Sequence, residues 1–88
     1  ADLDRYLPWW RGLDPVRQRV LIDMSFNMGM GAPNRGGLLS FVNTLSEIRR
    51  GNYGIAADMM LASKWAQQVG RRAVRLATMM RTGMDYTE

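Results

Sequence analysis

The segment from Asp14 to Gly29 carries both end signals of a single helix. Aspartate is a favoured N-cap residue, so Asp14 suits the position just before the first turn. Pro15 suits the first helical position, where the N–H that proline lacks would have no partner. Gly29 suits the C-terminal stop, because glycine readily takes the left-handed conformation that ends many helices. This segment is therefore expected to be one helix.

The apolar residues of this helix are expected to cover a wide surface. One line recurs at helical spacing and is broadened by neighbours: Val16, Val20, Met24 and Met28, with Leu21, Ile22 and Phe26. A polar line runs beside it: Arg19, Asp23 and Asn27. A wide apolar surface is typical of a helix in the centre of a domain, so we predict that this helix is mostly buried.

The rest of the chain also favours helices. Four glycines and a proline within residues 29–37 predict a loop, and no segment alternates apolar and polar residues as a half-buried strand would. Helical spacing or end signals occur in five further segments: the last turns before Pro8 in residues 1–7, then 38–50, 53–63, a short turn or helix at 64–68, and 70–82. The sequence therefore predicts an all-α fold, and 88 residues suffice for one domain.

The composition limits the chemistry of the chain. It has no histidine and no cysteine, which excludes imidazole catalysis, disulfides and the common transition-metal sites. Carboxylates remain as possible general acids: Asp2, Asp4, Asp14, Asp23, Glu47, Asp58, Asp85 and Glu88. Glycoside hydrolysis normally needs two facing carboxyl groups roughly 5 to 9.5 Å apart, and no spacing here supplies such a pair. We therefore assign no catalytic residue, no metal ligand and no cofactor.

The net charge of +4 favours an anionic partner without identifying it. Nucleic acid, an anionic membrane surface and the bacterial cell wall all qualify. No apolar run approaches the roughly 20 residues that a membrane span needs. The first residues are acidic before they are apolar, unlike a secretory signal, so the sequence by itself leaves the localisation unknown.

The stretch SKWAQQVGRRAVR, residues 63–75, surrounds Trp65 with amides and cations. Two interpretations of Trp65 remain open: a core or hinge residue between short helices, and an aromatic platform for a ligand. Arg71 and Arg72 would lie at the start of a helix, where the helix dipole disfavours cations. An anion near Gly70 would be held by these arginines and by the free N–H groups of that helix.

Several motifs occur in a particular order: LDPVRQRVLIDMSFNMG, a glycine-rich loop, FVNTL, GNYGIAADMMLASKW, RRAVR and RTG. From about Leu13 to Gly83 this order resembles the C-terminal lobe of phage-type (T4-like) lysozymes. The resemblance implies a small orthogonal lobe of several helices over residues 13–88. Residues 1–12 would be the end of the helix that joins the two lobes of such enzymes, with its linker.

The resemblance also implies a function. These lysozymes hydrolyse the β-1,4 bond between N-acetylmuramic acid and N-acetylglucosamine in peptidoglycan. The resemblance implies that such an enzyme stays in the host cytoplasm before its release to the periplasm and cell wall. Their catalytic residues lie in the N-terminal lobe, which nothing here matches, so this chain alone is expected to be inactive. The resemblance assigns substrate contacts to six residues: Phe26, Asn27, Thr44, Trp65, Gln68 and Arg72.

Peptidoglycan and the missing N-terminal lobe are thus the expected partners. Apolar side chains crowd residues 3–10, so the chain is also expected to self-associate there if that lobe is absent. One alternative is a stand-alone helical module that binds peptidoglycan or a protein. A second is a basic nucleic-acid binder, but no familiar reader motif occurs, so no nucleic acid is expected.

Overall fold

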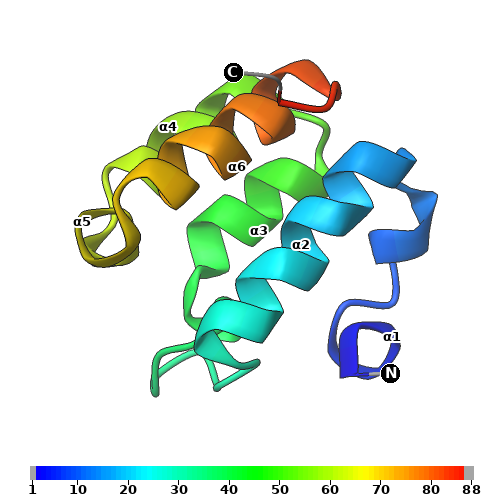
Figure 1. Cartoon of the computed structure of the whole chain (residues 1–88). Helices are drawn as coiled ribbons and strands as arrows, with labels where there is room; N and C mark the ends of the chain where they lie inside the picture. Colours follow the sequence, from blue (N-terminus) through cyan, green and yellow to red (C-terminus); the bar gives the residue numbers. More distant parts are fainter. Residues whose placement is uncertain (1, 87–88) are drawn as a thin grey trace.

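The computed structural model describes residues 2–86, which form helices joined by short loops (Figure 1). No strand longer than an isolated bridge occurs in this part of the chain. The all-α prediction is therefore confirmed. The helices are α1 (Asp2–Tyr6), the 3-10 helix η1 (Trp10–Gly12), α2 (Pro15–Met28), the 3-10 helix η2 (Leu38–Ser40), α3 (Val42–Arg49), α4 (Tyr53–Leu61), α5 (Lys64–Val69) and α6 (Arg71–Thr82).

Local signals set the ends of α2 as the sequence predicted. The Asp14 carboxylate accepts a hydrogen bond of 3.1 Å from the backbone N–H of Arg17, which satisfies a donor of the first turn. Pro15 occupies the first turn, and Gly29 ends the helix with φ 72°. At the other end of the chain, Gly83 adopts the left-handed conformation and ends α6.

One predicted helix is divided in the structure. Residues 38–50 form η2 and then α3, because Phe41 between them takes ψ 54°, outside the helical region. No proline or glycine near Phe41 announces this break. The break points the Phe41 ring toward Trp65, with the ring centroids 6.0 Å apart in a T-shaped arrangement.

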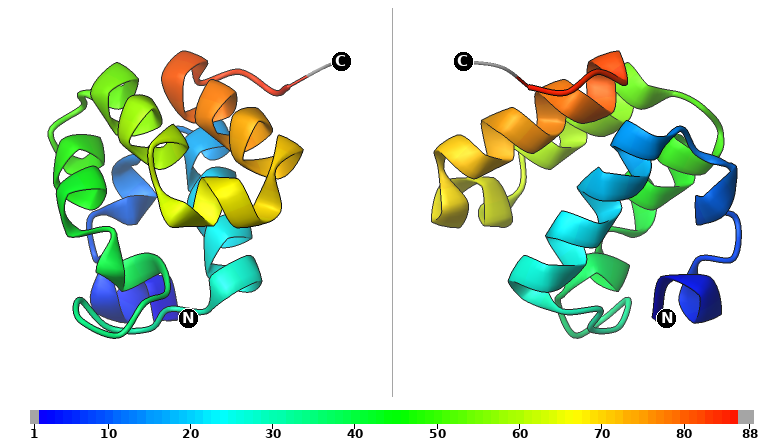
Figure 2. Two further views of the ribbon diagram at one scale, coloured as in Figure 1. Left: turned by 90° about the vertical axis from the view of Figure 1, so that its left-hand side faces the viewer. Right: turned by 45° about the vertical axis from the view of Figure 1, so that its right-hand side comes forward.

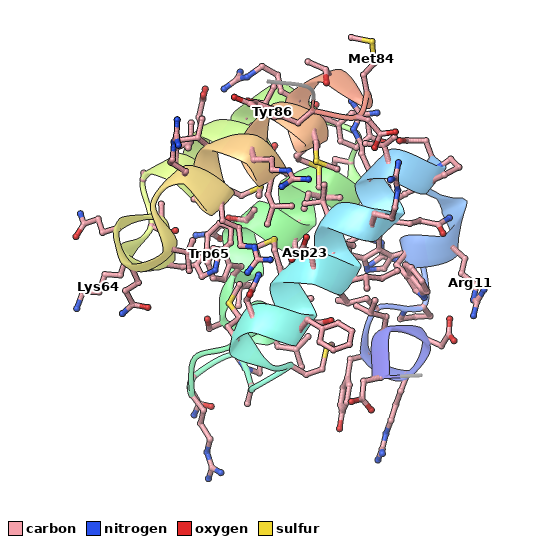
Figure 3. All side chains as sticks on the ribbon, in the orientation of Figure 1. Arg11, Asp23, Lys64, Trp65, Met84 and Tyr86 are labelled. Carbon is pink, nitrogen blue, oxygen red and sulfur yellow. The ribbon has the colours of Figure 1, made fainter. Side chains whose placement is uncertain are left out.

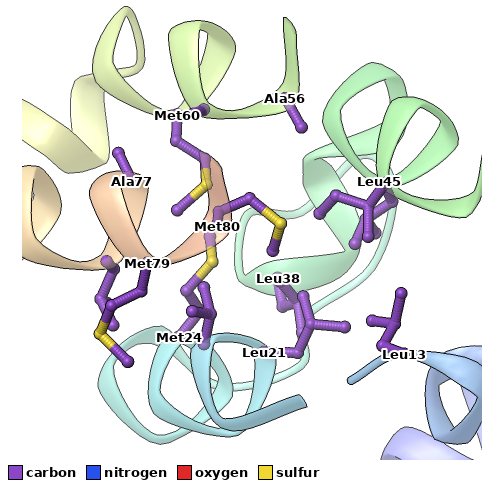
Figure 4. Close-up of a cluster of buried hydrophobic side chains, with 14 of the residues drawn as sticks. Leu13, Leu21, Met24, Leu38, Leu45, Ala56, Met60, Ala77, Met79 and Met80 are labelled. Carbon is purple, nitrogen blue, oxygen red and sulfur yellow. The ribbon is translucent and has the colours of Figure 1, made fainter. Parts of the chain in front are cut away.

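The helices pack in two groups around one core. α4 and α6 lie side by side, α3 packs against α4, and α2 crosses near α6 (Figures 1 and 2). Methionine and leucine side chains from these helices meet in the centre (Figure 4). The largest fully buried side chains are Leu21, Met24, Leu38, Ile48, Met60, Leu76, Met80 and Val20.

The prediction that α2 is mostly buried is wrong for its outer face. Val20, Leu21 and Met24 are buried, but 36% of Ile22 and 84% of Phe26 are exposed. The physical reason is that α6 and η2 pack against the inner face of α2, whereas the described chain leaves Phe26 uncovered. The apolar surface of α2 is therefore wider than the surface that other helices cover.

The first residues fold onto the same core. Leu3, Leu7 and Trp10 are buried, and the Trp10 Nε1–H donates a hydrogen bond of 2.7 Å to Asp4. The lobe itself covers these three side chains, so they are not free for the self-association expected through residues 3–10, which stays a prediction. Tyr6, 47% exposed, and the half-buried Trp9 are left as possible contacts for self-association. The division between residues 1–12 and 13–88 stays a prediction about a longer protein.

Arg17, near the N-terminus of α2, joins three helices. Its guanidinium donates hydrogen bonds to the carbonyl oxygens of Met80, at 2.7 Å, and Arg81, at 3.1 Å. It also lies 3.6 Å from the ring centroid of Tyr53 at the start of α4. A cation is favoured both at a helix C-terminus and over an aromatic face. Arg17 therefore fastens α2 to α4 and α6.

Candidate functional site

The six predicted substrate contacts divide between two hollows of the surface. Thr44, Trp65 and Gln68 line one hollow of about 450 Å³, which we call the tryptophan hollow. Phe26, Asn27 and Arg72 line a second hollow, which we call the α2 hollow. The complete lining of the tryptophan hollow is Met28, Gly36, Gly37, Ser40, Phe41, Thr44, Met59, Ser63, Lys64, Trp65 and Gln68.

Trp65 belongs to the core as well as to the hollow. Its side chain lies between α5 and the body of the lobe and is 6% exposed (Figure 3). The Ser63 hydroxyl accepts a hydrogen bond of 3.2 Å from the Ala66 N–H and so caps α5, which fixes Trp65 in its first turn. The buried Trp65 Nε1–H has no hydrogen-bond partner among the described residues. Between the two interpretations of Trp65, burial favours the core residue, although the side chain also lines the hollow.

The tryptophan hollow combines an apolar floor with a polar rim. Phe41 and Trp65 supply aromatic surface, whereas the exposed Lys64 and Gln68 side chains lie at the rim. The hydroxyl of Ser40 is already engaged, because it donates to the Gly37 carbonyl oxygen at 2.7 Å. Ligand pockets typically combine apolar lining with a few polar groups that orient the ligand. Lys64 and Gln68 are the groups available for that purpose.

The α2 hollow is held together by a polar chain across two helices. The Arg72 guanidinium donates a hydrogen bond of 2.8 Å to the Asn27 side-chain oxygen. The Asn27 amide in turn donates to the Asp23 carboxylate at 3.1 Å. Arg72 also lies 3.7 Å from Asp23, so this carboxylate pairs with α6. Phe26 stands beside the chain as an exposed aromatic ring.

Arg19 and Asp23 are four residues apart on α2, a spacing that favours a surface ion pair, but the structure contains a different pairing. Arg19 instead pairs with Asp85 at 2.6 Å. Residues 23 and 72 are brought together because α2 packs against α6. Helical spacing alone favours a pair between Arg19 and Asp23. The partner that Asp23 has in the fold, Arg72, is distant in sequence, so it is known only from the packing of the helices.

Arginines neutralise the carboxylates of the described chain. Six of them pair with an arginine within 4.0 Å: Asp4, Asp14, Asp23, Glu47, Asp58 and Asp85. Hydrogen bonds from Arg11 and then from Trp10 hold the pKa of Asp4 far below its usual value. A general acid needs a raised pKa, so the lowered pKa of Asp4 opposes that role for this residue.

The pKa of Asp14 is also lowered, but here burial opposes the shift more strongly than any other effect. Burial acts to raise its pKa and is the largest single effect, but the hydrogen bonds from the Arg17 backbone and side chain act with the Arg17 charge and the N–H of Asp14 to lower it overall. The pKa of Asp14 is therefore lowered. Within residues 2–86, no group of three or more acidic side chains is arranged to hold a metal ion.

Sequence reasoning missed three features of these two hollows. Phe41 lines the tryptophan hollow. It precedes Thr44 by three residues, about one helical turn, so the sequence could have indicated that the two side chains share a surface. Lys64 was noted only as a neighbour of Trp65, although it contributes to the rim. The contact between Asn27 and Arg72 had no signal in the sequence.

Searched against models of known protein families, the chain matches none. None of the helices within residues 2–86 has the length and apolar character to cross a membrane.

Proposed function

We propose that this chain is the C-terminal lobe of a phage-type lysozyme and supplies one wall of a peptidoglycan-binding cleft. The whole enzyme would hydrolyse the β-1,4 bond between N-acetylmuramic acid and N-acetylglucosamine. The observation that carries the proposal is the meeting of Thr44, Trp65 and Gln68 in one hollow. The order of sequence motifs supports it independently.

The chemistry of the tryptophan hollow suits a segment of peptidoglycan. An apolar floor of Phe41 and Trp65 can face the methyl group and ring carbons of an N-acetylated sugar. The Gln68 amide can hydrogen-bond the acetamido group, since it both donates and accepts. Lys64 can attract the carboxylate of muramic acid or of its peptide, and the net charge of +4 acts in the same direction.

The lobe is proposed to bind without cutting. The pKa values of Asp4 and Asp14 are both lowered, which opposes a role as general acid, and the sequence supplies no spacing typical of a facing carboxyl pair. The purified chain should therefore leave the turbidity of chloroform-treated Gram-negative cells at the level of buffer. Clearing above buffer would contradict the proposal that catalysis belongs to another lobe.

Co-sedimentation with purified peptidoglycan tests the binding wall. Gln68→Ala should lower the bound fraction, whereas Gln67→Ala should not, because Gln67 is exposed on the same helix but does not line the hollow. Lys64→Ala should weaken binding most at low salt, since exposed charges are screened over about 10 Å at 0.1 M. Equal binding by the Gln67 and Gln68 variants would contradict the proposed site. Tighter binding to short DNA than to peptidoglycan would favour the nucleic-acid alternative instead.

A further inference from the structure

A third hollow lies beside α6 and the segment that follows it. Five residues line it: Arg71, Arg72, Val74, Arg75 and Tyr86. We call it the arginine hollow. Three of its five lining side chains are arginines, and none is acidic.

The chain returns over α6 to form this hollow. After Gly83 the backbone turns back along the helix (Figures 1 and 2). The ion pair of 2.6 Å between Arg19 and Asp85 ties the returning segment to α2. Tyr86, half-buried against the core, then lies over α6 (Figure 3). The hollow is therefore built from a helix and a fastened segment.

Two of the three arginines that line this hollow form no ion pair with a carboxylate of the described chain. Arg11, Arg17, Arg19, Arg50, Arg72 and Arg81 each pair with a carboxylate. No such pair forms for Arg71 or Arg75 among residues 2–86, and both side chains are exposed. They stand four residues apart on one helix, a spacing at which like charges repel.

The helix itself adds to this excess of positive potential. Arg71 is the first residue of α6, where the helix dipole is positive, and Gly70 supplies no side chain to accept a hydrogen bond from the first turn. The like-charged pair, the dipole and the missing cap are unfavourable for the same reason. One anion in the hollow would relieve the repulsion between Arg71 and Arg75 and the unfavourable interaction of Arg71 with the helix dipole.

We propose that the arginine hollow binds a phosphate monoester. A guanidinium donates paired hydrogen bonds that match phosphate oxygens, and the Tyr86 hydroxyl offers a further donor. A monoester carries nearly two negative charges at neutral pH, and so matches the two unpaired arginines, Arg71 and Arg75, better than a singly charged diester does. This site goes beyond the proposed cell-wall function, because Arg71, Arg75 and Tyr86 line neither of the other hollows.

An NMR titration with glycerol phosphate at fixed ionic strength tests the site. The expected result is a saturable shift of the Arg71 and Arg75 side-chain N–H signals, with weaker binding of dimethyl phosphate. Arg71→Gln together with Arg75→Gln should raise the dissociation constant at least about tenfold, the loss expected for one charge-assisted hydrogen bond. Arg72 stays unchanged, so its bond to Asn27 is kept.

The matched control removes the same charge elsewhere. Arg35→Gln with Arg49→Gln also lowers the net charge by two, and both of these arginines are exposed and lie outside the hollow. The site is refuted if this control weakens binding as much as the Arg71 and Arg75 change, because general attraction would then explain the affinity. Tighter binding of dimethyl phosphate than of glycerol phosphate would refute the monoester. Loss of phosphate binding with peptidoglycan binding intact would separate this site from the cleft wall.

Discussion

Trp65 shows how one side chain can belong both to the core and to a ligand surface. Its ring is 6% exposed and packs edge-on against Phe41, yet it lines the tryptophan hollow. The same burial leaves its Nε1–H without a partner. A buried donor without a partner costs about 1 to 3 kcal/mol. The packing of the ring must therefore outweigh this cost.

Two substitutions at this position should separate packing from the polar atom. Trp65→Ala should destabilise the lobe by about 3 to 5 kcal/mol, the usual loss for a buried tryptophan. Trp65→Phe should cost less than half as much, because it keeps an aromatic ring beside Phe41 and removes the unpaired donor. Urea unfolding followed by circular dichroism measures both. A phenylalanine variant as unstable as the alanine variant would mean that Nε1–H has a partner after all.

This dual placement explains why the residue types alone left Trp65 ambiguous. Aromatic, amide and cationic neighbours in sequence are compatible with a platform and with a core residue, and burial decides between them. Asn27 and Arg72 pose the same difficulty, since their hydrogen bond depends on how α2 and α6 pack. Sequence indicated which residues could make a site, whereas their grouping into separate hollows required the folded chain.

At the scale of the helices, the ends were easier to predict than the covered faces. The residues at the ends of α2 and at the C-terminus of α6 act on backbone groups a few positions away, so their effect can be inferred from the local sequence. They are Asp14, Pro15, Gly29 and Gly83. Whether Phe26 is covered depends on which elements pack against α2. The break at Phe41 likewise has no local signal.

The first turn of α6 supplies a prediction about the helix dipole. Arg71→Glu should stabilise the lobe by about 0.3 to 1 kcal/mol, because a negative charge is favoured at a helix N-terminus and would also relieve the repulsion from Arg75. Arg49→Glu is the control with opposite sign, since Arg49 lies in the last turn of α3. Thermal unfolding at low salt measures both changes, which should shrink near 1 M salt. Destabilisation by Arg71→Glu would contradict the prediction.

The absence of histidine and cysteine shapes the pH response of the whole molecule. Between about pH 5 and pH 8 none of its side-chain types ordinarily titrates. Stability should therefore be nearly constant in that range and fall under acid conditions. The pKa of Asp14 in the fold is lowered from 3.8, so its contribution is complete above that value and disappears as the pH falls through the lowered pKa.

Asp14→Asn isolates this contribution because asparagine can still cap α2. The variant should be less stable than the wild type at pH 7, with the difference shrinking below about pH 4 as the wild-type carboxylate becomes protonated. Urea midpoints across the pH range measure it. A difference that stayed constant down to pH 2 would show that the charge of Asp14 is not responsible.

The two adjacent tryptophans should have different effects on the molecule. Trp10 is buried and bonded to Asp4, so Trp10→Ser should lower stability by about 3 kcal/mol or more. Trp9 is half-buried, so Trp9→Ser should keep the helical circular dichroism and reduce any self-association through residues 3–10. Sedimentation equilibrium with circular dichroism checks both. An unfolded Trp9 variant would place that ring in the core and leave Tyr6 as the exposed contact.

The fastening of α2 by Arg17 has a consequence for evolutionary change in this protein. A side chain on Gly83 would have its first carbon 2.8 Å from the Arg17 guanidinium, and the left-handed backbone there, with φ 69°, disfavours most residues as well. A shorter side chain at position 17 would remove the first obstacle and leave the second, which asparagine tolerates better than most. Lineages that lose Arg17 should therefore be the ones in which asparagine replaces Gly83, so that two positions distant in the chain drift together.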